Sequence, residues 1–255
     1  MPTTTGLRAV AATRYVTPLR EGGSLPGLLE ADDDGLYVAK FRGAGQGTRA
    51  LVAEVIVGEL ARALGLLVPE LVRIEIDSVL GAAEPDPEIQ ELVTASAGSN
   101  LGVDFLPGAL PYTPAGNWAP DPSLAADIVW LDALVTNVDR TARNPNLLLW
   151  HGRLWLIDHG AALYLQHQGL DPGAHAERPF PLIAEHVLLH RAGPITGAHK
   201  RLAGHVDRGL LERVVSMVPG DWFSADVAET YVEYLLRRLS RAHFAEEAER
   251  VRPAA

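Results

Sequence analysis

Two neighbouring segments, NVDRTARNPNLLLW at residues 137–150 and RLWLIDHG at residues 153–160, constrain this chain most. They place Asp139 first, then Asn144 and Asn146 just ahead of an apolar run, and Asp158 after a second apolar run. In metal-assisted phosphoryl transfer, one Asp orients the acceptor hydroxyl, and an Asn and a second Asp beyond the next strand bind Mg²⁺. The order predicts Asp139 as the catalytic carboxylate and Asp158, with Asn144 or Asn146, as metal ligands.

The same residues are also compatible with an acidic β-hairpin of no catalytic role. Strands at 147–150 and 154–157 would be joined by residues 151–153 and flanked by solvated polar residues. Short Asp/Asn motifs recur by chance, so the upstream half of the chain must decide between the two interpretations.

Composition limits the class of protein. The 255 residues are 47% hydrophobic and 21% charged, which is ordinary for a folded protein with one large core or two small lobes and allows a globular enzyme. The absence of cysteine excludes disulfides and thiolate metal sites. No apolar run of about 18 residues and no signal-peptide core is present, so we expect a cytoplasmic protein, as a monomer or weak oligomer.

The net charge of −10 opposes binding to nucleic acid or to an anionic membrane, because such binding depends on Lys and Arg neutralising phosphates. We therefore expect neither partner. An ATP site needs only a few local cations and remains compatible with this charge.

Lysine is rare in this chain. Of 22 basic residues, only Lys40 and Lys200 are lysine. Lys40 lies in an apolar, β-favouring run at 35–41, where its ammonium could meet phosphate oxygens. The alternative is a charged residue that protects an edge strand from aggregation.

Two features flank this strand. A Gly-rich segment at 20–27 contains Gly22, Gly23 and Ser24, whose backbone N–H groups could face phosphate, although most such clusters are plain turns. Residues 48–65 predict a helix, with Thr48 as N-cap and Gly65 as its stop. This mostly apolar helix carries Glu54 and Glu59, and either could pair with Lys40, since the order of Gly-rich loop, strand Lys and helix Glu positions an ATP-binding lysine.

The rest of the chain suggests two lobes. Further strands are expected at 71–76 and 102–106, and Pro107 and Gly108 break the pattern. Beyond a loop at 112–123, helices are expected at 123–134, 210–217 and 227–248. The expectation is an α+β, two-lobed, protein-kinase-like fold, with a β-rich N-lobe at 1–107 and an α-helical C-lobe at 108–255.

The chain resembles the compact HipA-like kinase family, distant relatives of the HipA toxin kinases and of phosphatidylinositol kinases. The resemblance rests on AEVIVGELARALGLLVP at 53–69, LVTNVDRTARNPNLLLW at 134–150 and LWLIDHG at 154–160. It implies a catalytic Asp139, a Mg²⁺-binding Asp158 and an ATP-phosphate Lys40. Glu54 is implied as the helix partner of Lys40, with Glu59 as the alternative.

Three departures qualify the resemblance. Asn144 is the fifth residue after Asp139, as in the kinase pattern, whereas Asn146 directly precedes the strand and is favoured here for the metal and the catalytic set. His159 replaces the Phe that kinases usually carry between Asp and Gly. The chain is also much shorter than a full HipA toxin, so neither toxin function nor a DNA-linked antitoxin partner is expected.

Together these features predict an ATP- and Mg²⁺-dependent kinase that phosphorylates a hydroxyl acceptor. Adenine would lie near Phe105 and Leu106. The expected acceptor is a protein Ser/Thr, with a small alcohol as one alternative and a nucleotide-binding pseudokinase as another. Arg140 and Arg143 could stabilise the transferring phosphate or be structural. His186 and His190 lack the acidic residue of a metalloprotease motif.

Overall fold

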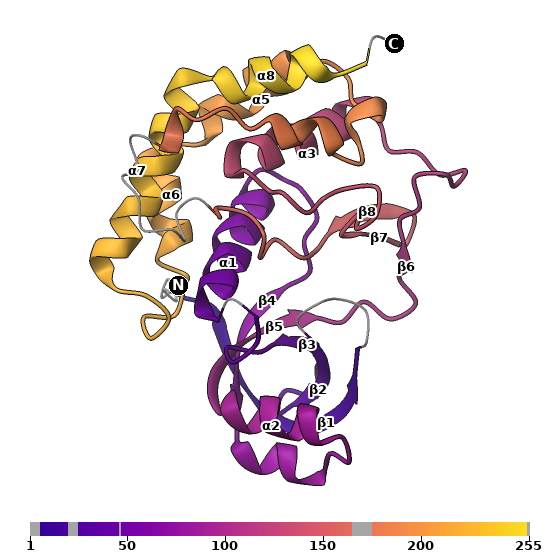
Figure 1. The fold of residues 1–255 in the computed structure, drawn as a ribbon, viewed down its shortest axis with the longest axis vertical. Helices are drawn as coiled ribbons and strands as arrows, with labels where there is room; N and C mark the ends of the chain where they lie inside the picture. The colour runs from indigo at the N-terminus through magenta and orange to yellow at the C-terminus, as the bar shows by residue number, and fades with distance from the viewer. Residues whose placement is uncertain (1–5, 20–24, 46, 165–174, 254–255) are drawn as a thin grey trace.

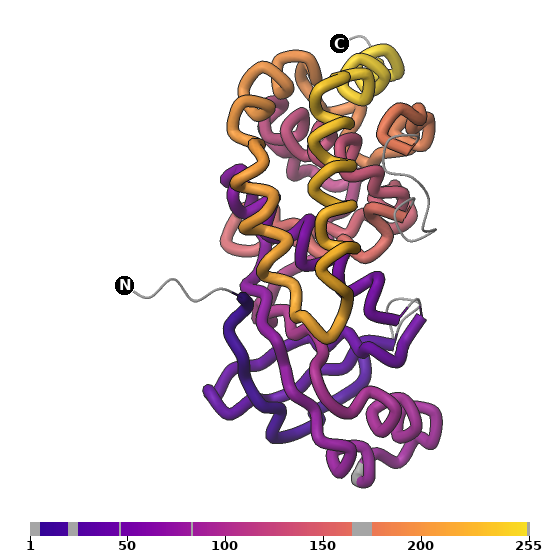
Figure 2. The backbone as a smooth tube through the Cα atoms, turned by 90° about the vertical axis from the view of Figure 1, so that its left-hand side faces the viewer, coloured from indigo at the N-terminus to yellow at the C-terminus, as the bar shows by residue number. Residues whose placement is uncertain are grey.

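The computed structural model describes residues 6–19, 25–45, 47–164 and 175–253, and it shows the expected α+β, two-lobed fold (Figures 1 and 2). A strand-rich part forms the lower half of Figure 1 and a helical part forms the upper half. The fold class predicted from the sequence is confirmed.

A closed five-stranded barrel forms the strand-rich part. Its order is β1-β2-β3-β5-β4, and the circle is closed by parallel pairing of β1 with β4, whereas the other pairs are antiparallel. Closure removes the unpaired edges that an open sheet would expose. The strands are β1 (Arg8–Pro18), β2 (Gly27–Ala31), β3 (Leu36–Lys40), β4 (Leu71–Ile76) and β5 (Gly98–Asp104).

Alternation along β3 decides where Lys40 lies. Tyr37 and Ala39 are buried in the barrel core, together with Leu29 and Ile74. Successive side chains of a strand point to opposite faces, so Val38 and Lys40 lie on the outer face of the barrel. The η1 segment (Ser78–Ala83) and α2 (Pro87–Ala95) pack against the barrel and close its far end (Figure 1).

Helix α1 (Thr48–Ala63) stands between the barrel and the helical part (Figure 1). Apolar residues surround it on most sides, and ten of its residues are buried. Its core side chains, such as Val55 and Ile56, belong to the same hydrophobic cluster as those of the C-terminal helices. Glu54 therefore lies on a helix that is fixed by the core.

The helical part is built around the buried helix α3 (Pro122–Val135), which α5 and α8 cover. A small antiparallel sheet, β6-β7-β8, lies beside it. The elements are β6 (Leu110–Pro111), β7 (Leu147–Trp150), β8 (Arg153–Leu156), η3 (Pro181–Glu185), η4 (Leu189–Arg191), α5 (Ile195–Leu202), η5 (Ala203–His205), α6 (Arg208–Val215), α7 (Ala225–Arg241) and α8 (His243–Val251).

Several predicted boundaries differ from the structure. Gly47, not Thr48, is the N-cap of α1, with no side-chain cap bond. Asp121, not Ser123, caps α3, because its carboxylate accepts the Ser123 N–H and Pro122 favours the first helical position. Gly65, at φ 82°, ends α1 as expected.

Three further elements were predicted incompletely. The helix expected at 227–248 is interrupted at Ala242, whose φ of 55° is left-handed. Strand β5 begins earlier than expected and ends at Asp104. Strand β1 was not predicted, because only Val10 of its eleven residues is buried and the apolar alternation is weak.

No helix in the described part of the chain is long and apolar enough to cross a membrane.

Candidate active site

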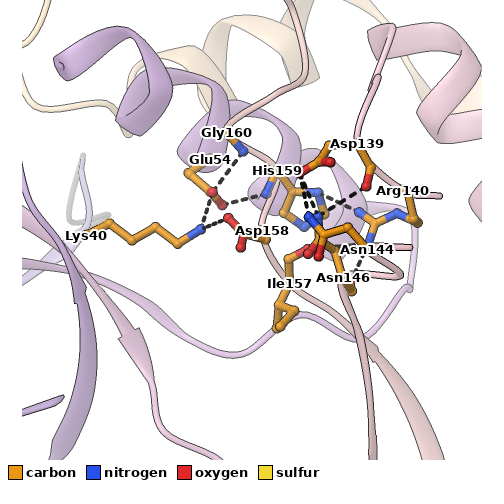
Figure 3. A network of polar contacts seen from close by, with 10 residues as sticks. All are labelled: Lys40, Glu54, Asp139, Arg140, Asn144, Asn146, Ile157, Asp158, His159 and Gly160. Atoms are coloured by element: carbon orange, nitrogen blue, oxygen red, sulfur yellow. Dashed lines mark hydrogen bonds and ion pairs between the residues drawn. The ribbon is translucent and has the colours of Figure 1, made fainter. Parts of the chain in front are cut away.

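Lys40 reaches from the outer face of the barrel to two carboxylates (Figure 3). Its ammonium forms a short ion pair with Glu54 on α1 and a second ion pair with Asp158 at 2.5 Å. Only 14% of the Lys40 side chain is exposed. Three residues separated widely in sequence thus meet at one charged centre, and Glu59 pairs instead with Arg62 at 3.6 Å.

The Glu54 carboxylate also holds the backbone that follows Asp158. It accepts the N–H of His159 at 2.8 Å and the N–H of Gly160 at 2.8 Å. A Cβ at residue 160 would lie 3.1 Å from a Glu54 carboxylate oxygen, so this close approach favours glycine. A single buried carboxylate therefore links the lysine to the segment that carries Asp158.

These contacts set the charges of the centre. Burial disfavours the Lys40 ammonium, but Glu54 and Asp158 hold the pKa of Lys40 above its usual value. The Lys40 ammonium lowers the pKa of Asp158 to about 2. Burial raises the pKa of Glu54, while Lys40 and the His159 N–H act in the opposite sense. At neutral pH the centre presents a charged lysine and an ionised Asp158.

Asp139 forms hydrogen bonds with both candidate asparagines, Asn144 and Asn146 (Figure 3). Its carboxylate accepts the Asn144 side-chain N–H at 2.7 Å and the Asn146 side-chain N–H at 3.3 Å. The amide nitrogens of Asn144 and Asn146 donate to Asp139, so their amide oxygens are not used in the contact with this carboxylate. Asn144 is exposed, whereas Asn146 is 8% exposed. The structure thus brings the predicted carboxylate and both asparagines together.

Asn146 and Asp158 share a backbone conformation that non-glycine residues rarely adopt. Their φ angles are 50° and 61°, both left-handed. Strained backbone of this kind persists only where surrounding contacts fix it, and it concentrates at functional sites.

A cavity of about 880 Å³ opens at the Lys40 centre, within the size range of small-molecule sites. Lys40, Glu54 and Asp158 line it together with Phe105 and Leu106, where adenine was predicted to lie. Its walls are mostly apolar, and are contributed by the residues Val38, Val68, Leu71, Val103, Leu148 and Leu156. A small molecule with an apolar body and a polar end matches this lining.

The backbone that leads to Phe105 and Leu106 is fixed by hydrogen bonds to the barrel part of the chain. Phe105 donates its N–H to the Leu36 carbonyl at 2.9 Å, and Asp104 donates to the Glu70 carbonyl at 2.8 Å. The segment therefore leaves β5 in a fixed path along the cavity. Gly22, Gly23 and Ser24 lie outside the described residues, so their predicted phosphate contacts stay a prediction.

The oxygen donors at this place suit a hard divalent cation such as Mg²⁺ or Mn²⁺. Within the ranges that the structure describes, no three His, Cys, Asp or Glu residues cluster as a metal cage. Mg²⁺ is usually bound through one or two carboxylates plus the phosphates of the substrate, with oxygen ligands only. Asp158 and an Asn144 or Asn146 amide oxygen offer that kind of partial site.

A buried polar network lies behind these residues, and the sequence did not predict it. Asp132, in the last turn of α3, accepts hydrogen bonds from Arg140 at 2.5 Å, His186 at 2.9 Å and the Asn137 side chain at 2.9 Å. Asn137 in turn accepts the Asp139 N–H at 3.1 Å. The available signal was Asp132 itself, an acid with apolar neighbours on both sides in the sequence, which requires partners if it is buried.

His159 belongs to this network through its ring. Arginine has only donors, so the 3.2 Å contact with Arg140 makes Nδ1 of His159 the acceptor and places the proton on Nε2. Burial, reinforced by Arg140, lowers the pKa of His159 to about 3. The ring is therefore neutral, and its Nε2 has no hydrogen-bond partner among the described residues.

The chain is similar to known proteins in sequence and in fold. The model of a family described as HipA-like kinase matches residues 13–247. A solved structure of the Helicobacter pylori proinflammatory kinase CtkA is similar at a TM-score of 0.63 and 14% identity, covering 96% of this chain and 97% of that one. At this identity the likeness shows the fold.

The Golgi casein kinase, solved with Mn/ADP bound, is similar at a TM-score of 0.49 and 15% identity, over 96% of this chain and 74% of that one. This TM-score is too low to carry an argument. No curated protein sequence matches the chain at a significant level.

Proposed function

The chain belongs to the HipA-like kinase family, and from this premise we propose that it is an ATP- and Mg²⁺-dependent kinase that transfers the γ-phosphoryl group to a hydroxyl. The observation that carries the proposal is the meeting of Lys40, Glu54 and Asp158 at one end of an apolar cavity. Such a centre offers a cation to phosphate oxygens and a carboxylate to a metal.

Each residue of the centre has one role in this proposal. Phe105 and Leu106 bind the adenine, and Lys40 holds phosphate oxygens while Glu54 fixes its position. Asp158 and Asn146 hold Mg²⁺, with Asn144 as the alternative amide. When bound, Mg²⁺ would neutralise charge on the phosphates. Positioning and charge neutralisation supply most of the rate.

Asp139 orients the acceptor hydroxyl and accepts its proton. Its carboxylate is held by two side-chain amides and its N–H by Asn137. A group fixed in this way loses little freedom when the acceptor binds. Arg140 does not reach the phosphates in this proposal, because it is buried.

We favour protein Ser/Thr as the acceptor, with a small alcohol as the alternative. A pseudokinase that binds nucleotide without transfer is the second candidate, and the replacement of Phe by His159 favours it. The complete Lys40, Asp139 and Asp158 set favours transfer.

Calorimetry with ATP in the presence of Mg²⁺ or EDTA, followed by measurement of released or transferred phosphate, tests the proposal. We expect wild type to bind ATP only with the metal and to turn it over, and Asp158→Asn to lose the metal dependence. Tight metal-free binding by wild type would contradict the Mg²⁺ role. Metal-dependent binding without turnover would favour the pseudokinase.

A further inference from the structure

Arg140 follows Asp139 directly but points into the protein. It is 1% exposed, and the guanidinium donates to three groups from two segments, residue 146 and residues 157–159 (Figure 3). It contacts the Asn146 carbonyl closely, the Ile157 carbonyl at 3.3 Å and Nδ1 of His159 at 3.2 Å. Asn146 is itself a candidate metal ligand, and Ile157 and His159 flank Asp158 in the sequence.

The charge of Arg140 is balanced inside the core. Its Nε donates to Asp132 at 2.5 Å, and both side chains are fully buried. Burial opposes ionisation of Asp132, but Arg140 and His186 bring the pKa of Asp132 well below its usual value. The ion pair is therefore permanent at physiological pH, and it anchors the guanidinium to α3.

The bonded carbonyls belong to the strained parts of the site. Asn146 is itself left-handed, and Ile157 immediately precedes the left-handed Asp158. The Asn146 carbonyl also accepts the Ile157 N–H at 3.1 Å, so the two segments are joined directly as well as through Arg140. Loss of the guanidinium would take this donor from the Ile157 carbonyl and leave the Asn146 carbonyl with the Ile157 N–H alone, so both segments could relax.

We propose that Arg140 is the positioning residue that sets the distance between the Asp158 carboxylate and the Asn144/Asn146 amide pair, and thereby the affinity of the site for a divalent cation. The inference rests on the proposed function. Arg140 acts through backbone, not by contact with metal or phosphate. Partners that orient metal ligands typically change metal affinity by about 10–100-fold when they are mutated.

Arg140→Lys is the central variant. A lysine keeps the positive charge beside Asp132, but its single nitrogen cannot bond Asp132, Asn146 and Ile157 in the geometry of the planar fork. We expect Mn²⁺ binding, measured by electron paramagnetic resonance with saturating ADP, to weaken by about tenfold or more. Adenosine binding, measured by calorimetry, should stay within about twofold of wild type because the apolar end of the cavity is untouched.

Arg238→Lys is the matched control. Arg238 is also a buried arginine, but it donates to the carbonyls of Ala133, Ala176 and Arg178, away from the metal ligands. The change should lower the melting temperature and leave the Mn²⁺ affinity unchanged. The double variant Asp132→Asn/Arg140→Gln removes both buried charges together. If Arg140→Lys does not fold, Mn²⁺ binding is measured on this double variant instead.

The outcomes separate the two proposals. Weakened Mn²⁺ binding with unchanged adenosine binding in the Arg140 variants, and not in Arg238→Lys, supports the inference. Mn²⁺ affinity equal to wild type in a folded Arg140 variant overturns it. Equal losses of Mn²⁺ and adenosine binding also overturn it, since they indicate general loosening. If wild type binds neither Mn²⁺ nor ADP, the proposed function fails and the inference falls with it.

Discussion

The Glu54 carboxylate accepts the backbone N–H of His159 at 2.8 Å, across 105 positions of sequence. The same carboxylate pairs with Lys40 and accepts the Gly160 N–H. One side chain of α1 thus holds the lysine and the segment after Asp158 in a single arrangement. The Lys40 ion pair and the segment that carries Asp158 are therefore joined through this one carboxylate.

Replacement of Glu54 by Gln should disturb both contacts. The amide keeps the size of the side chain, but it removes the negative charge beside Lys40. It also places an N–H next to groups that are themselves donors, the Lys40 ammonium and the backbone N–H groups of the segment after Asp158. We expect turnover to fall at least about tenfold and the unfolding free energy to fall by about 1–3 kcal/mol. Glu59→Gln is the control on the same helix, because Glu59 pairs with Arg62. Steady-state kinetics and urea unfolding measure the two effects, and equal kinetics for the two variants would contradict the role given to Glu54.

The two lysines of the chain form a natural pair of variants. Lys40→Arg keeps the charge but replaces a compact ammonium with a planar guanidinium. We expect this variant to fold and to lose about tenfold or more of its ATP turnover, on the scale of losing one transition-state charge contact. Lys200→Arg changes an exposed residue of α5 and should retain full turnover. The edge-strand interpretation of Lys40 is wrong, because β3 pairs with both β2 and β5. Wild-type turnover in Lys40→Arg would contradict the phosphate contact proposed for Lys40.

His186 links stability to pH. Its Nδ1 accepts the Leu188 N–H at 3.1 Å, so the neutral ring carries its proton on Nε2, which donates to Asp132. Burial lowers the pKa of His186, although Asp132 acts in the opposite direction. The unfolded chain therefore binds a proton just below pH 6.5 that the folded chain does not bind, and stability falls as pH falls through that range.

His186 accounts for a difference of at most one bound proton between the unfolded and the folded chain. This corresponds to a slope of about 1.4 kcal/mol of unfolding free energy per pH unit. His186→Gln should flatten the dependence of unfolding free energy on pH between about 6.5 and 5. His190→Gln removes an exposed histidine four residues away and is the control. Urea unfolding at several pH values gives the slopes, and an unchanged slope in His186→Gln would show that the folded protein protonates this ring readily.

Much of the fold could be predicted from local pattern. Alternation and β-favouring residues located β3, β4 and the β7-β8 hairpin, and helical periodicity located α1 and α3. The order of Lys40, Glu54 and Asp158 predicted a convergence that the structure shows at one cavity. Asp139 bonds to Asn144 and Asn146 in a separate polar cluster. The hairpin interpretation was also right about local structure: His151 and Gly152, at φ 48° and 73°, form the turn between β7 and β8.

The rest depends on long-range contacts that local pattern does not encode. The parallel closure of β1 on β4 joins residues more than sixty positions apart, and β1 is too exposed to show a clear alternation. The burial of Arg140 depends on Asp132 in a helix that precedes it. The choice between Glu54 and Glu59 depended on which side of α1 meets Lys40. The lobe boundary near residue 108 and the roles of the asparagines stay predictions.

The most direct test of the account is transfer of labelled γ-phosphate from ATP, with wild type and Asp139→Ala compared in a cell extract. Asp139 holds side-chain amides and lies outside the buried ion pair, so Asp139→Ala should fold and bind Mg-ATP with near wild-type affinity. Its kcat should fall by at least about a hundredfold, the scale of losing an acid–base or orienting group. We predict acceptors that are labelled by wild type and not by Asp139→Ala, among them proteins labelled on Ser or Thr. Equal labelling by the two proteins would contradict the catalytic role of Asp139 and with it the central claim.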